Sequence, residues 1–295
     1  MAGRQPVPDR QQLVRRFEES RARGIPLIGA GAGTGLSAKC AEVAGVDFIV
    51  IYNAGRFRMA GRGSMAGMMP YGNANDIVVE MAAEVLPVVS TTPVLAGVCA
   101  TDPFKNIPLF LEQLKLMGFA GVQNFPTVSL LDGDTRINLE ETGYGFDKEV
   151  EMVATARELG LLTATYVRTT DEARQMTAAG ADVVVAHVGL TSAGLLGAKT
   201  GLSLSDAAER VQQIRDACAA QRPDVLVVCH GGPIATPDDA QQVLQQTEGV
   251  AGFLGASSME RIPVEEAMVD TMRRFKSIKL GELDAAVGEF RTGEL

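Results

Sequence analysis

Short apolar runs alternate with amphipathic segments along almost the whole chain, and no other feature restricts the possible folds as much. Each run is at most eight residues long and nearly continuously apolar, as expected of strands that are buried on both faces. Eight strand–helix units in a chain of this length predict a (β/α)8 TIM barrel. The eight runs are Pro26–Ala32, Asp47–Asn53, Pro93–Ala100, Gly121–Phe125, Leu162–Val167, Asp182–Val188, Val225–Cys229 and Val250–Gly255.

A doubly wound open sheet is the alternative architecture for such an alternation, but it normally has about five or six strands. Its dinucleotide-binding fingerprint, GxGxxG, is also missing. The fingerprint requires a glycine at the position where Thr34 follows Gly29 and Gly31. The barrel is therefore the favoured fold.

The amphipathic segments have readable helix ends, because glycine or proline follows most of them. A further helix over Asp9–Ala22 is predicted to cover the bottom of the barrel, and residues 281–295 read as a polar C-terminal tail. We therefore expect a single TIM-barrel domain over residues 10–280. The predicted barrel helices are Leu36–Ala44, Asp76–Val89, Ile107–Met117, Asp147–Leu159, Asp171–Ala179, Ser205–Ala220, Pro237–Thr247 and Val264–Phe275.

Composition and charge exclude several classes of protein. Hydrophobic residues make up 46% of the 295 residues, which is enough for a packed core and unlike a disordered chain. The formal net charge of −9 argues against nucleic-acid and membrane partners, and every apolar run is too short to span a bilayer. The polar N-terminus lacks a secretory signal, and Cys40, Cys99, Cys218 and Cys229 form no CxxC pair. We expect reduced thiols and a cytoplasmic location.

The candidate catalytic residues lie at strand ends, because TIM barrels carry their function at the C-terminal ends of the strands. The chain has only two histidines, His187 and His230, and both lie at the ends of predicted strands, as does Tyr166. Imidazole titrates near neutral pH, so we predict that at least one histidine acts as an acid or a base, with Tyr166 as a third candidate. The alternative is that the histidines only orient loops at the barrel rim.

The candidate substrate-binding residues lie in the neighbouring connections. The connection after the second run has about 20 residues rich in glycine, methionine and arginine, and we predict a structureless loop that acts as a lid. Its arginines could bind a carboxylate or a phosphate, or could simply be solvated or lie at a subunit contact. The sequences HGGPI and GASSMER resemble an anion-binding cradle, and the alternative is that their glycines simply permit tight turns. The full set is Asn53, Arg56, Arg58, Arg62, Gln123, Asn124, Gly231, Gly232, Ser257 and Ser258.

Acidic residues after the third and fourth runs could hold a divalent cation. Carboxylate oxygens are the ligands that Mg²⁺ prefers, so Asp102 and Glu141 are the candidate metal ligands. The segment LDGDTR is interpreted as a turn, and its acidic residues as structural. Cys99 is interpreted as a core residue rather than a nucleophile.

Several longer motifs are similar to those of the phosphoenolpyruvate hydrolase-like TIM-barrel family. They are GAGTGLSAK, NAGRFRMAGRGSMAGMMPYGNAN, VLAGVCATDPF, GVQNFPTVSLLDG, LEETGYGFDKEVEM, HVGLTSAG, HGGPI and GFLGASSMER. The resemblance covers residues 10–280 and implies a relationship to the phosphoenolpyruvate/pyruvate barrel superfamily, whose members usually need Mg²⁺ and form oligomers. The chain lacks the KRCG-type signature of isocitrate lyases, because Cys99 stands in a different context.

Two functions from different classes follow. The first is an enzyme that acts on a small anionic 2-oxo acid or enol phosphate, as a hydrolase, a mutase or a C–C or C–P lyase, through a metal-stabilised enolate. The alternative is a non-catalytic regulatory barrel that binds a ligand or a protein. A plant member of the family whose barrel belongs to a tobamovirus-resistance protein motivates this alternative. Apolar residues in Val264–Phe275 and in the methionine-rich loop predict a homo-oligomer.

Overall fold

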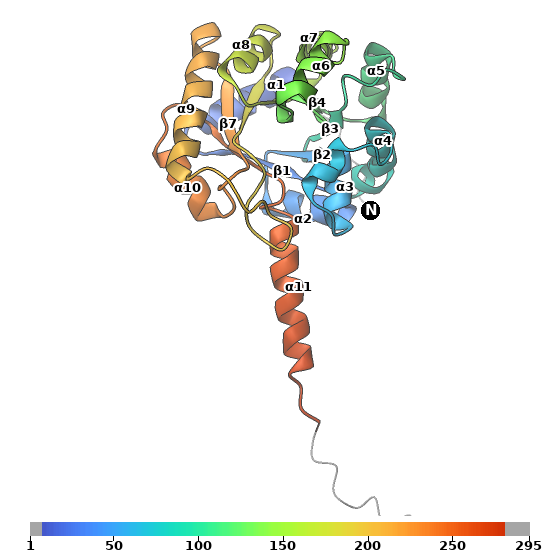
Figure 1. Cartoon of the computed structure of the whole chain (residues 1–295), viewed down its shortest axis with the longest axis vertical. Coiled ribbons are helices and arrows are strands. Elements are labelled where there is room, and N and C mark those ends of the chain that lie inside the picture. The colour runs from blue at the N-terminus through green and yellow to red at the C-terminus, as the bar shows by residue number, and fades with distance from the viewer. Residues whose placement is uncertain (1–7, 281–295) are drawn as a thin grey trace, which may run out of the picture.

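Eight parallel strands close into one barrel in chain order, with β8 paired to β1 (Figure 1). The structure, a computed structural model, describes residues 8–280. The predicted (β/α)8 TIM barrel is confirmed, and each strand lies within two residues of the predicted bounds. The strands are β1 Leu27–Gly31, β2 Phe48–Ile51, β3 Val94–Val98, β4 Gly121–Asn124, β5 Leu162–Val167, β6 Val183–His187, β7 Leu226–His230 and β8 Gly252–Gly255.

Seven helices form the outer layer between consecutive strands, and their ends follow the expected capping chemistry. The side chain of Thr34 accepts a hydrogen bond from the Ser37 backbone N–H at the start of α2, and Gly45 ends that helix with φ of 78°. Thr236 caps α10 in the same way as Thr34 caps α2. The helices are α2 Gly35–Ala44, α4 Ala74–Val85, α5 Ile107–Met117, α7 Phe146–Glu158, α8 Thr170–Ala178, α9 Leu204–Gln221 and α10 Pro237–Gln245.

The predicted extra helix, α1 (Arg10–Ala22), covers the N-terminal end of the barrel. Phe17 is fully buried and packs on Phe48 inside the barrel, with ring centroids 6.1 Å apart. The guanidinium of Arg10 binds both carboxylate oxygens of Asp182, just before β6, at 2.5 and 2.9 Å. One end of the barrel is therefore closed, and only the opposite end is available for a site.

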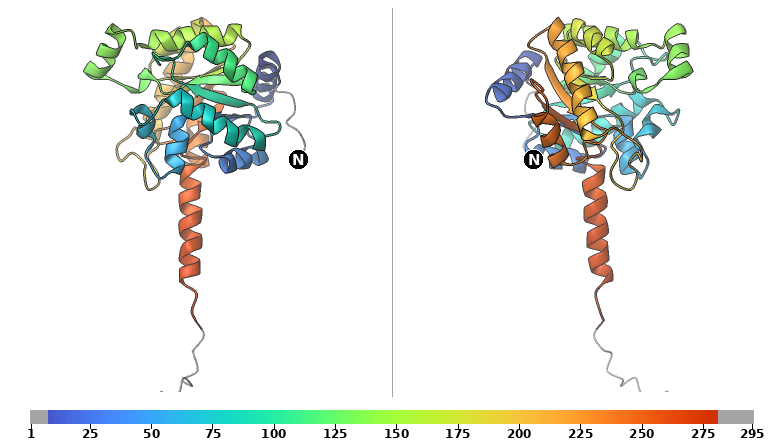
Figure 2. Two further views of the ribbon diagram at one scale, coloured as in Figure 1. Left: turned by 90° about the vertical axis from the view of Figure 1, so that its right-hand side faces the viewer. Right: turned by 60° about the vertical axis from the view of Figure 1, so that its left-hand side comes forward.

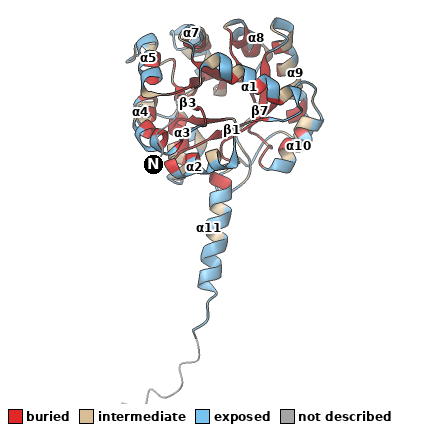
Figure 3. Ribbon diagram, turned by 180° about the vertical axis from the view of Figure 1, so that it is seen from behind, coloured by how far each residue is buried: buried red, intermediate tan, exposed pale blue. Residues whose placement is uncertain are grey.

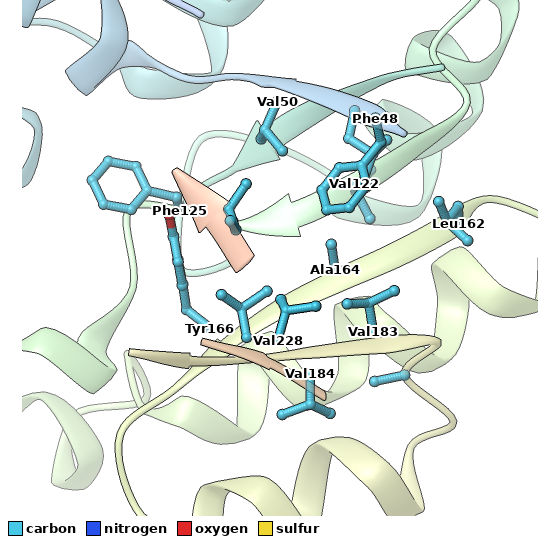
Figure 4. Packing of buried hydrophobic residues seen from close by; sticks show 14 of the residues in the cluster. Phe48, Val50, Val122, Phe125, Leu162, Ala164, Tyr166, Val183, Val184 and Val228 are labelled. Atoms are coloured by element: carbon cyan, nitrogen blue, oxygen red, sulfur yellow. The ribbon is translucent and has the colours of Figure 1, made fainter. Parts of the chain in front are cut away.

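A continuous apolar core fills the space inside the barrel and between strands and helices (Figures 3 and 4). Alternate residues of β5, Leu162, Ala164 and Tyr166, follow one another along the barrel, and all are buried. Figure 4 shows Tyr166 beside Phe125 at one end of this packed column. The core thus ends in aromatic side chains at the C-terminal mouth.

The connection between β2 and β3 is not structureless, so that prediction is wrong. It contains the helix α3 (Asn53–Met59) and the 3-10 helix η1 (Ser64–Met68). The buried side chain of Asn53 accepts from the Ala54 backbone N–H and donates to the Gly67 carbonyl at 2.9 Å, which fixes the two helices to each other. Local polar contacts of this kind are not readable from hydrophobic periodicity.

The segment interpreted as a turn at LDGDTR is also different from the prediction, because it begins the helix α6 (Gly133–Glu141). Glu141 therefore lies on a helix rather than on an extended segment. The remaining short 3-10 helices are η2 (Leu86–Val88) and η3 (Val128–Leu130).

The last helix, α11 (Arg261–Lys276), leaves the barrel instead of covering it (Figures 1 and 2). Arg261 and Ile262 are buried, whereas most side chains beyond them are exposed. The predicted tail at 281–295 lies outside the described residues. Within residues 8–280, no helix has both the length and the apolar character needed to cross a membrane.

Candidate active site

A small cavity lies at the C-terminal mouth of the barrel, beneath the connection after β2. Its volume is ≈ 30 Å³, space for about two water molecules. The helix η1 closes it from above with Met65 and Met68. The lining residues are Tyr52, Ala54, Arg58, Ser64, Met65, Met68, Phe125, Leu130, Tyr166, His187, Gly189, Leu190, Thr191, His230, Ala256 and Ser257.

Three of the lining residues are the predicted catalytic candidates, which come from neighbouring strands. Tyr166 ends near the top of β5, and His187 and His230 are the last residues of β6 and β7. The register pairs the two histidines directly, and their ring centroids lie 4.8 Å apart. The Tyr166 ring lies 5.1 Å from His187 and 4.9 Å from His230. The three side chains therefore form one compact cluster.

Backbone contacts give the two imidazoles opposite roles. His230 donates from Nδ1 to the Leu254 carbonyl at 2.7 Å, so its Nε2 is free to accept and faces the Tyr166 hydroxyl at 3.3 Å. His187 accepts at Nδ1 from the Gly189 backbone N–H at 3.1 Å, so its neutral form carries the proton on Nε2. The cluster therefore offers one imidazole acceptor and one imidazole donor.

Burial keeps this cluster uncharged near neutral pH. Desolvation lowers the pKa of His230 to about 4, and the nearby positive charge of Arg58 acts in the same direction. Desolvation lowers the pKa of His187 well below its usual value, with further lowering by His230 and Arg168. Desolvation and the neighbouring Tyr52 raise the pKa of Tyr166 well above its usual value.

Arg58 supplies the positive charge in the cavity. Its side chain is 1% exposed and pairs at 3.4 Å with Glu260, which also accepts a hydrogen bond from the Gly33 backbone N–H. The buried Nε of Arg58 has no hydrogen-bond partner. Burial alone would lower the pKa of Arg58, but Tyr52 and Glu260 raise it above its ordinary value, so the guanidinium stays charged. A charged donor without a partner is suited to an anion.

The other predicted arginines of this connection lie outside the cavity. Arg56 pairs with Glu80 on the surface at 2.5 Å, and Arg62 donates to the carbonyls of Ala60 and Gly61. For Arg56 the reason is helical geometry, because side chains two positions apart on α3 are separated by about 200° around the helix axis. Of the three arginines, only Arg58 faces the barrel.

Two predicted residues of β4, Gln123 and Asn124, are buried within the barrel and do not line the cavity. Asn124 exchanges hydrogen bonds with the backbone of Tyr166 and donates to Glu149 at 2.6 Å. Gln123 is fully buried, and neither its amide nitrogen nor its amide oxygen has a partner. Asn53 holds α3 and η1 together, as described above.

The predicted glycine-rich cradle is divided. Ser257 lines the cavity, with its hydroxyl 3.4 Å from that of Ser64, whereas Ser258 lines a different hollow beside α10. Gly231 and Gly232 adopt positive φ of 79° and 58°, and the N–H of Gly232 donates to the Gly189 carbonyl. These two glycines therefore shape the turn after β7, because a side chain at Gly231 would collide with that same carbonyl.

The two candidate metal ligands, Asp102 and Glu141, differ in burial and in hydrogen bonding. Asp102 accepts hydrogen bonds from Asn73, Asn75 and the Phe104 backbone N–H, and although its burial raises its pKa, these bonds bring a net lowering. Glu141 is exposed on α6. Within the described part of the chain, no three His, Cys, Asp or Glu side chains are grouped so as to hold a metal ion.

Sequence reasoning missed the roles of Tyr52 and Glu260. Tyr52 follows Phe48 and Val50 in a period of two, a signal that could have placed it on the inner face of β2. Glu260 gave no such signal, because its partner Arg58 is distant in the sequence. A larger groove of ≈ 830 Å³ between α6, α8 and α9 contains Arg136, which is already paired with Glu140 and Glu172.

Comparison with known proteins identifies the family. A family model described as phosphoenolpyruvate hydrolase-like matches residues 12–278. A ToMV susceptible protein of tomato, Solanum lycopersicum, is 58% identical over 268 residues, which are 91% of this chain and 36% of that protein. The chain thus spans just over a third of the length of this curated relative.

Solved structures share the fold at low sequence identity. A 2,3-dimethylmalate lyase, described as a member of the PEP mutase/isocitrate lyase superfamily, has a TM-score of 0.56 and 16% identity, covering 95% of this chain and 91% of its own. A phosphonopyruvate hydrolase in complex with oxalate and Mg²⁺ has a TM-score of 0.57 and 16% identity, covering 96% and 93%. These structures show the fold alone, whereas the family model over residues 12–278 shows that the chain belongs to the phosphoenolpyruvate hydrolase-like family.

Proposed function

We propose that the chain is an enzyme that acts on a small anionic 2-oxo acid or enol phosphate, as a hydrolase, a mutase or a C–C or C–P lyase that passes through an enolate. One observation carries this proposal. A buried arginine with an unpartnered Nε faces the same cavity as an imidazole donor, an imidazole acceptor and a phenol. Convergence of charge and acid–base groups in a closed cavity is the usual arrangement of an active site.

The first step is binding of the anionic group. Arg58 would hold the carboxylate or phosphate through charged hydrogen bonds, and the Ser257 hydroxyl lies on the same wall to add a neutral donor. Glu260 keeps the guanidinium in place from the side away from the ligand. The low-dielectric surroundings make such contacts stronger than they would be in water.

The second step is proton transfer around the oxo group. The Nε2–H of His187 is placed to donate to the oxygen on which enolate charge develops, and Nε2 of His230 is placed to accept a proton. The Tyr166 hydroxyl lies 3.3 Å from Nε2 of His230 and orients that ring. Because both imidazoles start neutral, this chemistry needs no prior change of charge.

Access requires the lid to move. The cavity in its closed form holds about two water molecules, which is less than a 2-oxo acid needs. Met65 and Met68 of η1 are the roof, and their unbranched side chains can rearrange readily. Displacement of η1 would admit the substrate, and its return would exclude water from the enolate.

A Mg²⁺ ion is expected from the fold family, and the candidate ligands can be compared with what such an ion requires. The related fold of phosphonopyruvate hydrolase was solved with Mg²⁺ and oxalate, which supports the expectation of a metal. In this chain Asp102 could supply one oxygen ligand, but its carboxylate already accepts three hydrogen bonds and Glu141 is solvent-exposed. These residues do not fit a metal centre formed by protein ligands alone. No step above depends on one.

The test is turnover followed by NMR on a panel of phosphoenolpyruvate, phosphonopyruvate, oxaloacetate and branched 2-oxo diacids, with Mg²⁺ and then with chelator. We expect loss of one component in wild type and a strong decrease in Arg58→Lys, which keeps the charge but loses the forked donor geometry. Arg174→Lys, at an exposed position on α8, is the matched control. Equal turnover in the wild type and in Arg58→Lys would refute the assigned site. Loss of turnover on addition of chelator would show that the reaction needs a metal ion.

A non-catalytic regulatory barrel is the second candidate. It is favoured by the name of the tomato relative, which refers to virus susceptibility rather than to an activity, and by the closed state of the cavity. Tight binding of a panel member without any chemical change would support this candidate. With either function we propose a cytoplasmic homo-oligomer, in keeping with four free cysteines and with exposed apolar side chains on α11.

A further inference from the structure

A second and more open hollow, here called the annex, lies beside the active-site cavity at the same end of the barrel. Its volume is ≈ 380 Å³, compared with ≈ 30 Å³ for the active-site cavity. It is bounded by the connections after β2, β3 and β4 and by the end of α6. A space of this size lies within the range of small-molecule sites, and no step of the proposed chemistry uses it.

The two cavities share one thin wall. Met68 lines both of them. In two other segments the wall is one residue thick: Phe125 faces the active-site cavity and the adjacent Pro126 faces the annex, and Leu130 and Leu131 are divided in the same way. A shift of the Met68 side chain would therefore join the two spaces.

The annex is chemically unlike the active-site cavity. Its walls include Met69, Phe104, Leu139 and Tyr144, which offer carbon, sulfur and ring surface rather than charge. The one ionised group is the carboxylate of Asp102, which is fixed by its hydrogen bonds to Asn73 and Asn75. A negative charge there repels a second carboxylate, and the lining contains no Lys, Arg or His that would neutralise one.

We propose that the annex binds an uncharged, largely apolar arm of the substrate whose anionic group is held by Arg58. This inference rests on the proposed function and narrows it to 2-oxo acids with one carboxylate and an apolar side chain, in preference to diacids. Met68 is the residue that separates the arm from the reacting centre. Its flexible thioether suits a position that must yield to substrates of different shape.

Three acids of graded chemistry test the inference by calorimetric titration of the full chain, with and without Mg²⁺. Pyruvate has no arm, 4-methyl-2-oxopentanoate has an apolar arm, and 2-oxoglutarate has an arm that ends in a charge. We expect 4-methyl-2-oxopentanoate to bind at least about tenfold more tightly than pyruvate, because each buried methylene adds affinity. We expect 2-oxoglutarate to bind more weakly than 4-methyl-2-oxopentanoate.

Two variants of α6 test whether the annex is the source of the preference for an apolar arm. Leu139→Trp places an indole ring in the annex. Ile137→Trp adds the same ring to an exposed position of the same helix, α6, and this position lines the separate groove between α6, α8 and α9. The preference for 4-methyl-2-oxopentanoate over pyruvate is expected to collapse in Leu139→Trp and to persist in Ile137→Trp. Circular dichroism shows whether each variant is folded.

The outcomes separate this inference from the proposed function. Equal binding of pyruvate and 4-methyl-2-oxopentanoate, tightest binding of 2-oxoglutarate, or a preference that survives Leu139→Trp would overturn the annex assignment alone. Binding of none of the three acids by wild type would count against the proposed function as well. Binding that depends on Arg58 but shows no preference among arms would keep the function and remove the annex from it.

Discussion

Arg58 and Glu260 form an ion pair whose two side chains are each 1% exposed, and this pair links the start of α11 to the active-site cavity. We expect Glu260→Gln to lower the free energy of unfolding by up to about 3–5 kcal/mol, because it leaves a buried guanidinium without its counter-charge. Anion affinity should fall as well, since Arg58 loses the partner that orients it. Urea denaturation and pyruvate titration measure the two effects.

The control for this variant is Glu266→Gln, an exposed position on α11, the helix that Glu260 precedes. It should leave both quantities unchanged within about 0.5 kcal/mol. If Glu260→Gln were as stable as Glu266→Gln, the ion pair would contribute nothing, and the charge of Arg58 would need another explanation.

The low pKa of His230 predicts the pH dependence of turnover. Because its pKa falls to about 4 in the folded chain, its Nε2 remains an acceptor through the mildly acidic range. The acidic limb of a turnover profile should therefore lie near pH 4 rather than near the ordinary histidine value of about 6.5. Measurement of kcat/KM against pH gives this directly, and an acidic limb near 6.5 would contradict the buried neutral imidazole.

The same shift makes stability depend on pH. Because the pKa of His230 is lowered on folding, the unfolded chain binds more protons than the folded chain between pH 4 and 6.5. The contribution of the neutral imidazole to the free energy of unfolding is therefore complete above pH 6.5 and is lost as pH falls toward 4. The full loss is on the order of 3 kcal/mol. Glu149 acts oppositely, because burial raises its pKa to about 8, so its contribution is lost as pH rises through 8. Subtracting the stability curve of His230→Gln from that of wild type isolates the histidine.

At the residue scale the structure brings His187, His230 and Tyr166 together in one cavity, whereas only some of the predicted substrate-binding residues line it. His187, His230 and Tyr166 were predictable because parallel strands of a barrel end at one rim, so their position in the strands was enough. Arg58 could not be separated from Arg56 without knowing that the connection is helical. The pairing of Arg58 with Glu260 depends on tertiary packing and left no local signal.

At the scale of the element, η1 is the roof of the active-site cavity, and Gly67 sets how closely it approaches the barrel. A Cβ on Gly67 would lie 2.6 Å from the Ala54 Cβ and 3.1 Å from the Phe125 ring. We expect Gly67→Ala to push η1 outward, to cost about 1–3 kcal/mol of stability and to weaken anion binding. Hydrogen exchange of the η1 amides should become faster.

Gly63 offers a matched control four residues earlier. It has an extended backbone with φ of −66°, and a Cβ there would meet nothing within 4 Å. Gly63→Ala should therefore leave stability and hydrogen exchange nearly unchanged. Similar behaviour of the two variants would mean that η1 does not pack closely enough to act as a lid.

Elements with strong periodicity and clear caps were predictable, and elements held by polar contacts were not. α5 occupies Ile107–Met117 exactly as predicted, since Asn106 caps one end and left-handed Gly118 the other. α3 depends instead on the hydrogen bonds of Asn53 to Ala54 and Gly67, and α6 has no buried side chain at all. Hydrophobic patterning carries no information about such segments.

At the scale of the whole molecule, no helix that follows β8 covers the barrel within residues 8–280. α11 follows this strand but projects away from it (Figure 2). A hollow of ≈ 210 Å³ remains beside α10 and is lined by Ile28 of β1, Leu244 of α10 and Phe253 of β8. Leu36 and Val43 on the nearby first barrel helix, α2, are 74% and 83% exposed. In a TIM barrel this position would ordinarily be covered by the eighth helix.

The projecting helix carries the complementary surface. Val264, Met268, Met272 and Phe275 recur every three or four residues, which places them along one stripe, and they are 37%, 50%, 60% and 70% exposed. The apolar stripe of one copy can cover the apolar hollow of a second copy. In a dimer with two-fold symmetry this contact forms twice, so both stripes and both hollows are buried. We therefore predict a dimer in which α11 of each copy covers the barrel of its partner.

Sedimentation equilibrium at micromolar concentration should give twice the chain mass of 31.2 kDa for the wild type. Met272→Glu is expected to shift the equilibrium to monomer, because it places a charge in the middle of the buried stripe at a cost of several kcal/mol per copy (about 2–4). Ala267→Glu, an exposed position five residues earlier on the same helix and about 140° around it from Met272, has the same new charge outside the stripe and should leave the dimer intact. A monomeric wild type, or equal dimerisation of the two variants, would show that the helix stands free. Since Glu260 lies where α11 begins and holds Arg58, dissociation should also weaken pyruvate binding, which connects the assembly to the chemistry at the barrel mouth.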